Sequence, residues 1–179
     1  MRHTMTTAPR TRDLKAALRE LDAAHAEVSS LGDGVAPSRL ERALARLDEA
    51  CRTPIASPWG EEEWDGVLER YWAEHEWIGI DQRARATSLC ALNEAPTRED
   101  VLELAPAAAP SAAMRAQAAR IEELSETMDD APAGSLWLAT QTLVDPEEDM
   151  DWRIVALVDV PASDEAGRVA LATVTVAPR

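Results

Sequence analysis

The chain has 179 residues, an apolar content of 46% and a formal net charge of −15, which predict one acidic globular domain with an appended helical arm. Such a charge repels phosphate backbones, so direct nucleic-acid binding is disfavoured and a protein partner fits better. No apolar run approaches the roughly 20 residues of a membrane span, no hydrophobic leader is visible and the two cysteines make no disulfide framework, so we expect a cytoplasmic protein without membrane contact.

The N-terminal part of the chain predicts a disordered start followed by a helical hairpin. Residues 1–10 show no apolar periodicity. In residues 11–31, side chains recur every three or four positions along one helical face: Leu14, Leu18, Leu21, His25 and Val28. Ser38 and Glu41 form an S-x-x-E helix-start motif, and the leucine spacing continues after it. We therefore predict a hairpin of two helices over residues 11–52. Packing on the body of the same chain is the simpler interpretation, and packing on a partner helix is the alternative.

A Trp-rich helix is predicted over residues 61–75, after a linker that contains two prolines. It opens with three glutamates, which suit the positive end of a helix dipole. Residues 84–92 predict a strand. Residues 95–133 hold two further predicted helices, Arg98–Leu104 and Ser111–Met128, separated by the sequence APAAAP. The apolar face of the Trp-rich helix consists of Trp64, Val67, Leu68, Tyr71 and Trp72.

The C-terminal third predicts three antiparallel strands. The runs SLWLATQTLV, WRIVALVDV and RVALATVTV are rich in strand-forming residues, and the turns between them, DPEEDMD and PASDEAG, are acidic. Together with residues 84–92 they predict an α+β domain over residues 61–179, in which the Trp-rich helix packs across a curved antiparallel sheet of about four strands. The indole side chains expected to share one core are those of Trp64, Trp72, Trp137 and Trp152.

Few residues point to catalysis. The sequence has no P-loop, no G-x-S-x-G nucleophile motif and no zinc-ligand spacing. We therefore expect no metal and no cofactor, and a non-enzymatic role is favoured over an enzymatic one. His75, which lies between two glutamates, is the best acid–base candidate, and Arg85 is a candidate for holding an anionic ligand. A favourable contact of His75 with the helix dipole and a surface ion pair of Arg85 are the simpler interpretations.

The acidic turn between the first two C-terminal strands is a candidate binding surface. It contains Asp145, Glu147, Glu148 and Asp149. Carboxylates in this number could attract calcium, but the run lacks the EF-hand spacing and its central glycine. An ordinary charged hairpin loop is the simpler interpretation, and among functional roles an acidic surface for a basic protein partner is favoured over a metal site.

Two segments together carry a family resemblance. The first is Y-W-x-E-H at residues 71–75, followed by an A-R pair that ends at Arg85. The second is D-P-x-x-D-x-D-W at residues 145–152, followed by S-D-E-A-G from Ser163 onward. The pattern resembles the C-terminal accessory domain of actinobacterial DEAD/DEAH-box RNA helicases, a domain of unknown function.

The resemblance covers residues 61–92 and 135–179, and residues 95–133 look like an insertion in it. No helicase motor motif is present, so the resemblance implies a small module that sits beside RNA machinery. The order of elements is also similar to the cystatin/NTF2-like cone, a topological similarity that implies no function.

Two functional hypotheses follow from these observations. The first is a non-enzymatic accessory or regulatory protein-interaction module, associated with an RNA helicase or other RNA machinery. The alternative is a small-molecule-binding or enzymatic NTF2-like cone that uses His75 or a buried acid. A deep apolar pocket with converging polar groups favours the alternative, whereas a filled interior favours the first hypothesis. Homodimerisation through a sheet edge is a further expectation.

Overall fold

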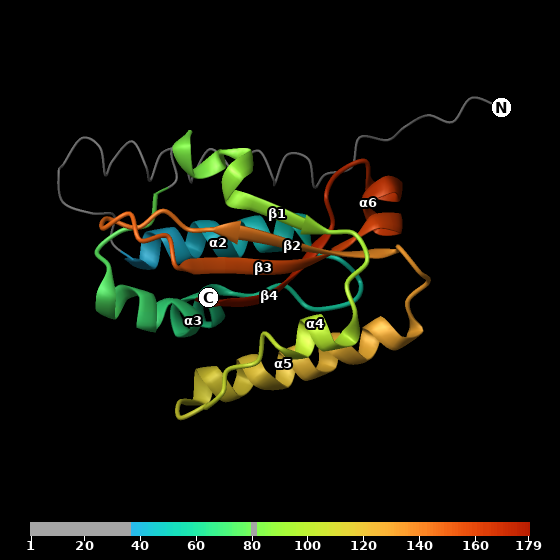
Figure 1. Cartoon of the computed structure of the whole chain (residues 1–179), viewed down its shortest axis with the longest axis horizontal. Coiled ribbons are helices and arrows are strands. Elements are labelled where there is room, and N and C mark those ends of the chain that lie inside the picture. The colour runs from blue at the N-terminus through green and yellow to red at the C-terminus, as the bar shows by residue number, and fades with distance from the viewer. Residues whose placement is uncertain (1–36, 80–81) are drawn as a thin grey trace.

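The computed structural model describes residues 37–79 and 82–179 and has the predicted α+β fold (Figure 1). The expected disordered start and the first helix of the hairpin lie outside the described residues. Four strands form one antiparallel sheet in the order β1-β2-β3-β4. The elements in chain order are α2 (Pro37–Cys51), α3 (Glu61–Glu74), the 3-10 helices η1 (Arg83–Arg85) and η2 (Thr87–Leu89), β1 (Cys90–Asn93), α4 (Arg98–Leu102), α5 (Ala112–Asp130), β2 (Leu136–Thr142), β3 (Trp152–Asp159), α6 (Val160–Ala166) and β4 (Leu171–Pro178).

Helices cover both faces of the sheet. Ile154 and Leu157 are three positions apart on β3, so their side chains point to opposite faces. Ile154 packs against the apolar cluster to which α2 and α3 contribute, and Leu157 belongs to the cluster to which α4 and α5 contribute. In Figure 1, α2 lies behind the strands, while α4 and α5 lie on the β4 side. A bulge at Val155/Ala156 interrupts the pairing of β3 with β4, and such bulges increase the local twist of a sheet.

Aromatic rings fill the core on the α3 side. The rings of Trp59 and Trp64 meet edge to face with their centroids 5.0 Å apart, and those of Tyr71 and Trp152 do so at 5.4 Å. The predicted tryptophan core is therefore confirmed for Trp64 and Trp152. Trp72 is only partly buried at the edge of this cluster, where the indole Nε1 donates to a carboxylate oxygen of Glu41 on α2 at 2.8 Å.

Trp137 lies outside this core, and its predicted place is wrong. It pairs with Val158 near one end of the sheet, whereas Trp152 pairs with Pro178 at the other end. The C-terminal half of α3 packs near Trp152. The Trp137 ring therefore does not reach this part of α3, and it remains partly buried. Residue type and alternation indicated an inward position, but only the register shows which end of the sheet the helix covers.

Two other predicted elements differ from the structure. The segment 84–92, predicted as a strand, folds mainly as η1 and η2. Only its final residues, which belong to β1, pair with β2. The sequence PASDEAG, predicted as a turn, lies largely in α6. Asp159 caps this helix by accepting the backbone N–H of Ala162 at 2.9 Å, a proline occupies the first turn, and Gly167 ends it with a φ of 63°. These are ordinary helix-boundary signals, so the sequence did contain them.

Helix starts were more predictable than strand bounds. The side chains of Thr97 and Asp100 form a capping box at the start of α4, in the T-x-x-D pattern of a helix start. The Ser111 hydroxyl accepts the backbone N–H of Met114 at 3.2 Å and caps α5. None of the helices among the described residues is long and apolar enough to cross a membrane. The edge strand β1 is exposed at all four positions, and the expected homodimer contact through a sheet edge stays a prediction.

Candidate functional site

The two segments that carry the family resemblance meet in space. α3 ends at Glu74, and the Nδ1 atom of the next residue, His75, lies 2.6 Å from the Oε2 atom of Glu147 in the β2–β3 loop. Next to this contact, the Gly79 N–H donates to the Val144 carbonyl at 2.7 Å. We refer to the contact of the β2–β3 loop with the end of α3 as the His75 junction. It joins residues about 70 positions apart in the chain.

Asp145 organises the loop from inside. Its carboxylate is fully buried, and its two oxygens accept the backbone N–H groups of Asp149 at 3.0 Å and Met150 at 2.6 Å. Glu148 and Met150 have φ values of 64° and 52°, in the left-handed region that non-glycine residues rarely occupy. The buried carboxylate therefore supports a loop conformation that the local sequence alone does not favour.

The expected acidic surface is smaller than the sequence indicated. Asp145 does not contribute to it, because its side chain is buried. Glu147 contacts His75, and Glu148 accepts a hydrogen bond from Arg83 at 2.6 Å, so two of its carboxylates are engaged within the chain. Arg85 is exposed on η1, two positions from Arg83.

The environment of His75 is aromatic and negatively charged. Its side chain is 8% exposed, and its ring centroid lies 4.6 Å from that of Tyr71. Burial raises the pKa of Tyr71 above its usual range, and the charges of Asp145, Glu147 and Asp151 raise that pKa further. The Tyr71 hydroxyl donates to the Trp77 carbonyl at 2.8 Å. The Nε2 atom of His75 is buried and has no hydrogen-bond partner.

His75, Asp145 and Glu147 each offer a ligand atom, and these atoms lie within 4.8 Å of one another. The sequence marked His75 and the acidic turn as separate candidates and missed their convergence, because ligand-spacing motifs detect only groups that are close in the chain. The joint occurrence of the two resemblance segments was the one signal that could have indicated it.

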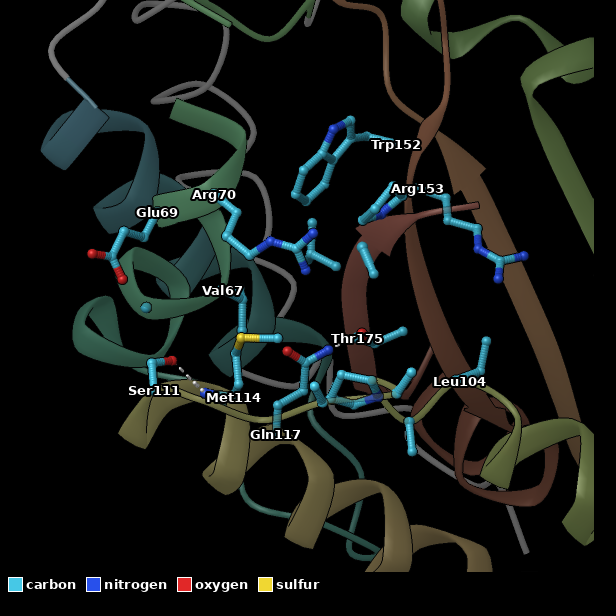
Figure 2. Close-up of a pocket in the computed structure, with 18 of the residues that line it drawn as sticks. Val67, Glu69, Arg70, Leu104, Ser111, Met114, Gln117, Trp152, Arg153 and Thr175 are labelled. Atoms are coloured by element: carbon cyan, nitrogen blue, oxygen red, sulfur yellow. Dashed lines mark hydrogen bonds between the residues drawn. The ribbon is translucent and has the colours of Figure 1, made fainter. Parts of the chain in front are cut away.

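A pocket of about 930 Å³ opens beside Trp152, between α3, the start of α5 and the ends of β3 and β4 (Figure 2). Arg70 reaches into it from α3, and its Cζ atom lies 5.8 Å from the centroid of the Trp152 ring. Figure 2 shows Met114 and Gln117 on the α5 side, while Glu69 points away from the pocket. The Gln117 amide donates to the Thr175 hydroxyl and fixes this wall.

The pocket gathers positive charge in a protein whose net charge is −15. Arg153 and Arg179 line it together with Arg70, and so do Glu69 and Glu103. Figure 2 shows Arg70 reaching into the pocket, whereas the Arg153 guanidinium points away from it. The Nε atom of Arg153 is buried without a hydrogen-bond partner, whereas Arg179 donates to the Thr142 hydroxyl at 2.7 Å. None of these arginines was a candidate in the sequence, because they are scattered along the chain and only the fold brings them to one pocket.

A second, smaller cavity of about 210 Å³ lies between α2 and the sheet, and its lining includes Asp48 and Cys51. Asp48 accepts the Thr173 hydroxyl at 2.6 Å and the Trp59 backbone N–H at 3.1 Å. Burial raises the pKa of Asp48 to about 6, although these hydrogen bonds and the Arg120 charge act in the opposite direction. Asp48 is thus a buried acid of the kind that the alternative hypothesis requires.

The comparison with protein families gives one match. Residues 11–176 match the family described as "Domain of unknown function (DUF3516)". This range is wider than the two segments of the resemblance, and it includes residues 95–133, expected as an insertion. No match was found among curated proteins or among solved structures. Because the matched range covers most of its length, the chain belongs to the DUF3516 family, whose function is unknown.

Proposed function

We propose that this domain is a non-enzymatic protein-interaction module that binds an extended acidic segment of a partner in the pocket beside Trp152. The observation that carries the proposal is the Arg70 guanidinium, which reaches into the pocket beside Trp152, with Arg153 and Arg179 also in its lining, in an otherwise strongly acidic chain. Guanidinium groups pair with carboxylates through two parallel hydrogen bonds, which gives such a pocket a preference for anionic side chains.

The shape of the pocket supports an extended occupant. Residues 175–179, at the end of β4, line it, and β4 is an edge strand of the sheet. An edge strand presents backbone groups that can pair with an incoming extended segment. The opposite wall consists largely of small residues from the APAAAP sequence.

The proposed partner belongs to RNA-helicase machinery. This part of the proposal is supported by the resemblance of residues 61–92 and 135–179 to the accessory domain of RNA helicases, and by the acidic body, which disfavours direct binding to RNA. A helicase that co-purifies with the wild-type domain and is lost with Arg70→Glu would support it. A helicase retained equally by both would place the contact elsewhere.

The binding mode is testable with three labelled peptides that alternate valine with glutamate, glutamine or lysine. Fluorescence anisotropy measures their affinity for the domain. Net charge alone predicts that the lysine peptide binds best to a chain of charge −15. The proposal predicts the reverse order, with the glutamate peptide binding best. Arg70→Glu should weaken its binding by about tenfold or more, which corresponds to about 1.4 kcal/mol.

Arg42→Glu is the matched control, because it makes the same charge change at an exposed position of α2 that does not line the pocket. It should leave the affinity for the glutamate peptide nearly unchanged. Equal losses from Arg42→Glu and Arg70→Glu, or tighter binding of the lysine peptide, would refute a specific anionic site.

The small-molecule alternative is favoured by one observation, the buried Asp48 at the cavity between α2 and the sheet. That cavity measures about 210 Å³, which is less than the roughly 300–1,000 Å³ of typical ligand pockets. Benzene is a suitable probe, because apolar cavities of about 150 Å³ admit it. Saturable benzene binding that Ala156→Leu abolishes would support this alternative, since Ala156 lines the cavity.

A further inference from the structure

Three potential metal ligands converge at the His75 junction from two separate parts of the chain. His75 follows the last residue of α3, and Asp145 and Glu147 come from the β2–β3 loop. The side chain of His75 is 8% exposed and that of Glu147 is 52% exposed, while Asp145 is fully buried. The group is therefore anchored inside the protein and remains accessible from solvent on the Glu147 side.

The distances suit a small divalent ion. The three ligand atoms lie within 4.8 Å of one another. Tetrahedral coordination with bonds of about 2.1 Å places ligand atoms about 3.4 Å apart. Shifts on the order of 1 Å therefore convert the present arrangement into a coordination shell, and the exposed Glu147 carboxylate can move by this amount. The ion would replace the proton now shared between His75 and Glu147.

The ring of His75 is buried and makes a side-chain hydrogen bond with Glu147 through its Nδ1 atom. Its Nε2 atom is buried and has no hydrogen-bond partner. A buried polar atom without a partner is rare in folded proteins and often marks a bound ion or a functional group.

The surroundings favour a cation and hold one ligand in place. Five of the seven residues from Asp145 to Asp151 are acidic, so an ion of charge +2 would reduce their mutual repulsion. The hydrogen bonds that Asp145 accepts from two backbone N–H groups fix the orientation of its carboxylate. Hydrogen bonds of this kind orient the ligands of metal sites before the ion binds.

We infer that His75, Asp145 and Glu147 bind a divalent first-row transition ion, with Zn²⁺ as the representative, and that this ion fastens the β2–β3 loop to the end of α3. An imidazole ligand favours such an ion over Ca²⁺ or Mg²⁺, which prefer ligand sets made of oxygen alone. Water completes the coordination on the exposed side. The inference does not rest on the proposed peptide binding.

The test uses the full chain with Cys90→Ser, which removes an exposed thiol that could bind zinc by itself. After treatment with a chelator, Zn²⁺ is titrated by calorimetry and the bound metal is counted after dialysis. We expect one Zn²⁺ per chain and a higher melting temperature. The Co²⁺ form should show no thiolate charge-transfer band, because the ligands are nitrogen and oxygen.

Glu147→Gln is the decisive variant, because its side chain is half exposed and its replacement is compatible with folding. It should weaken Zn²⁺ binding by about tenfold or more. Glu148→Gln, one position further in the same loop, changes the partner of Arg83 and no proposed ligand, so it should bind Zn²⁺ like the parent. Binding well below one ion per chain, equal affinities of the two variants, or equal affinity of the parent for Ca²⁺ would overturn the inference.

Discussion

Asp48 imposes a pH dependence on the stability of the core that Asp48→Asn should remove. Asp48 lies on the buried side of α2 and is 6% exposed, and burial raises the pKa of its carboxyl group from 3.8 to about 6. The folded protein therefore holds this proton more tightly than the unfolded chain does. Asparagine keeps the size of the side chain and one acceptor oxygen, but it cannot ionise.

The size and sign of the effect follow from the two pKa values. The folded and unfolded pKa values of Asp48 differ by about 2 units, and each unit corresponds to about 1.4 kcal/mol. Ionisation of Asp48 therefore changes the free energy of unfolding by up to about 3 kcal/mol. Between pH 3.8 and about 6 the folded state binds more protons than the unfolded state does. The contribution of Asp48 to the free energy of unfolding therefore falls as pH rises through that window, and it is lost completely above the window.

Urea unfolding at intervals from pH 4.5 to pH 8 measures the effect. The quantity of interest is the free energy of unfolding of the wild type minus that of Asp48→Asn, because other titrating groups largely cancel in this difference. It should fall with rising pH by roughly 2–3 kcal/mol. The hydrogen bond that asparagine cannot accept from Thr173 or Trp59 adds a constant offset without a slope.

Asp65→Asn is the control, because it makes the same chemical change at an exposed position of α3. Exposed substitutions of this kind usually change stability by less than about 0.5 kcal/mol. A difference between the wild type and Asp48→Asn that stays constant with pH, or rises with it, would refute the assignment of Asp48 as a buried acid with a raised pKa.

Four further substitutions test the core and the His75 junction by thermal and urea unfolding. Trp152→Ala should lower the free energy of unfolding by about 3–5 kcal/mol. Trp72→Ala should lower it by less, because Trp72 is only partly buried. A larger loss from Trp72→Ala than from Trp152→Ala would contradict the described core. Gly79→Ala should destabilise by about 1–3 kcal/mol, since its Cβ would lie 2.8 Å from the Cβ of Val144, and an unchanged midpoint would show that the contact is loose. Asp145→Asn should destabilise by about 1–3 kcal/mol, because one of the two buried N–H groups that it accepts loses its partner; full stability would mean that the loop does not depend on this carboxylate.

Local patterns in the sequence were sufficient for the fold class. The alternation of apolar residues in β2, β3 and β4 and the cap at Ser111 depend on neighbours in the chain, so they could be interpreted without coordinates. Trp137 shows where this reasoning ends. Its strand was predicted, but its neighbours depend on which part of the sheet α3 covers, and that is a property of register and of helix packing.

The candidate sites were less accessible to sequence reasoning, because each depends on residues that are far apart in the chain. His75 and Glu147 were both candidates, yet for different roles, and the fold joins them across 72 positions. Asp48 was not a candidate at all. It follows Leu47 on the leucine-rich face of α2, and an acid next to such a stripe is ordinarily exposed, so only its burial at 6% exposure marks it.

The proposals of peptide binding and of metal binding concern different sites, so either can be refuted without the other. The His75 junction and the pocket beside Trp152 draw on different side chains, and Trp152 is the element between them, since it packs on Tyr71 and also lines the pocket. Zn²⁺ could therefore bind normally to Arg70→Glu, and the glutamate peptide could bind normally to Glu147→Gln. Should each variant instead impair both ligands, the loop and the pocket wall would move together, and Trp152 is the contact through which that coupling would pass.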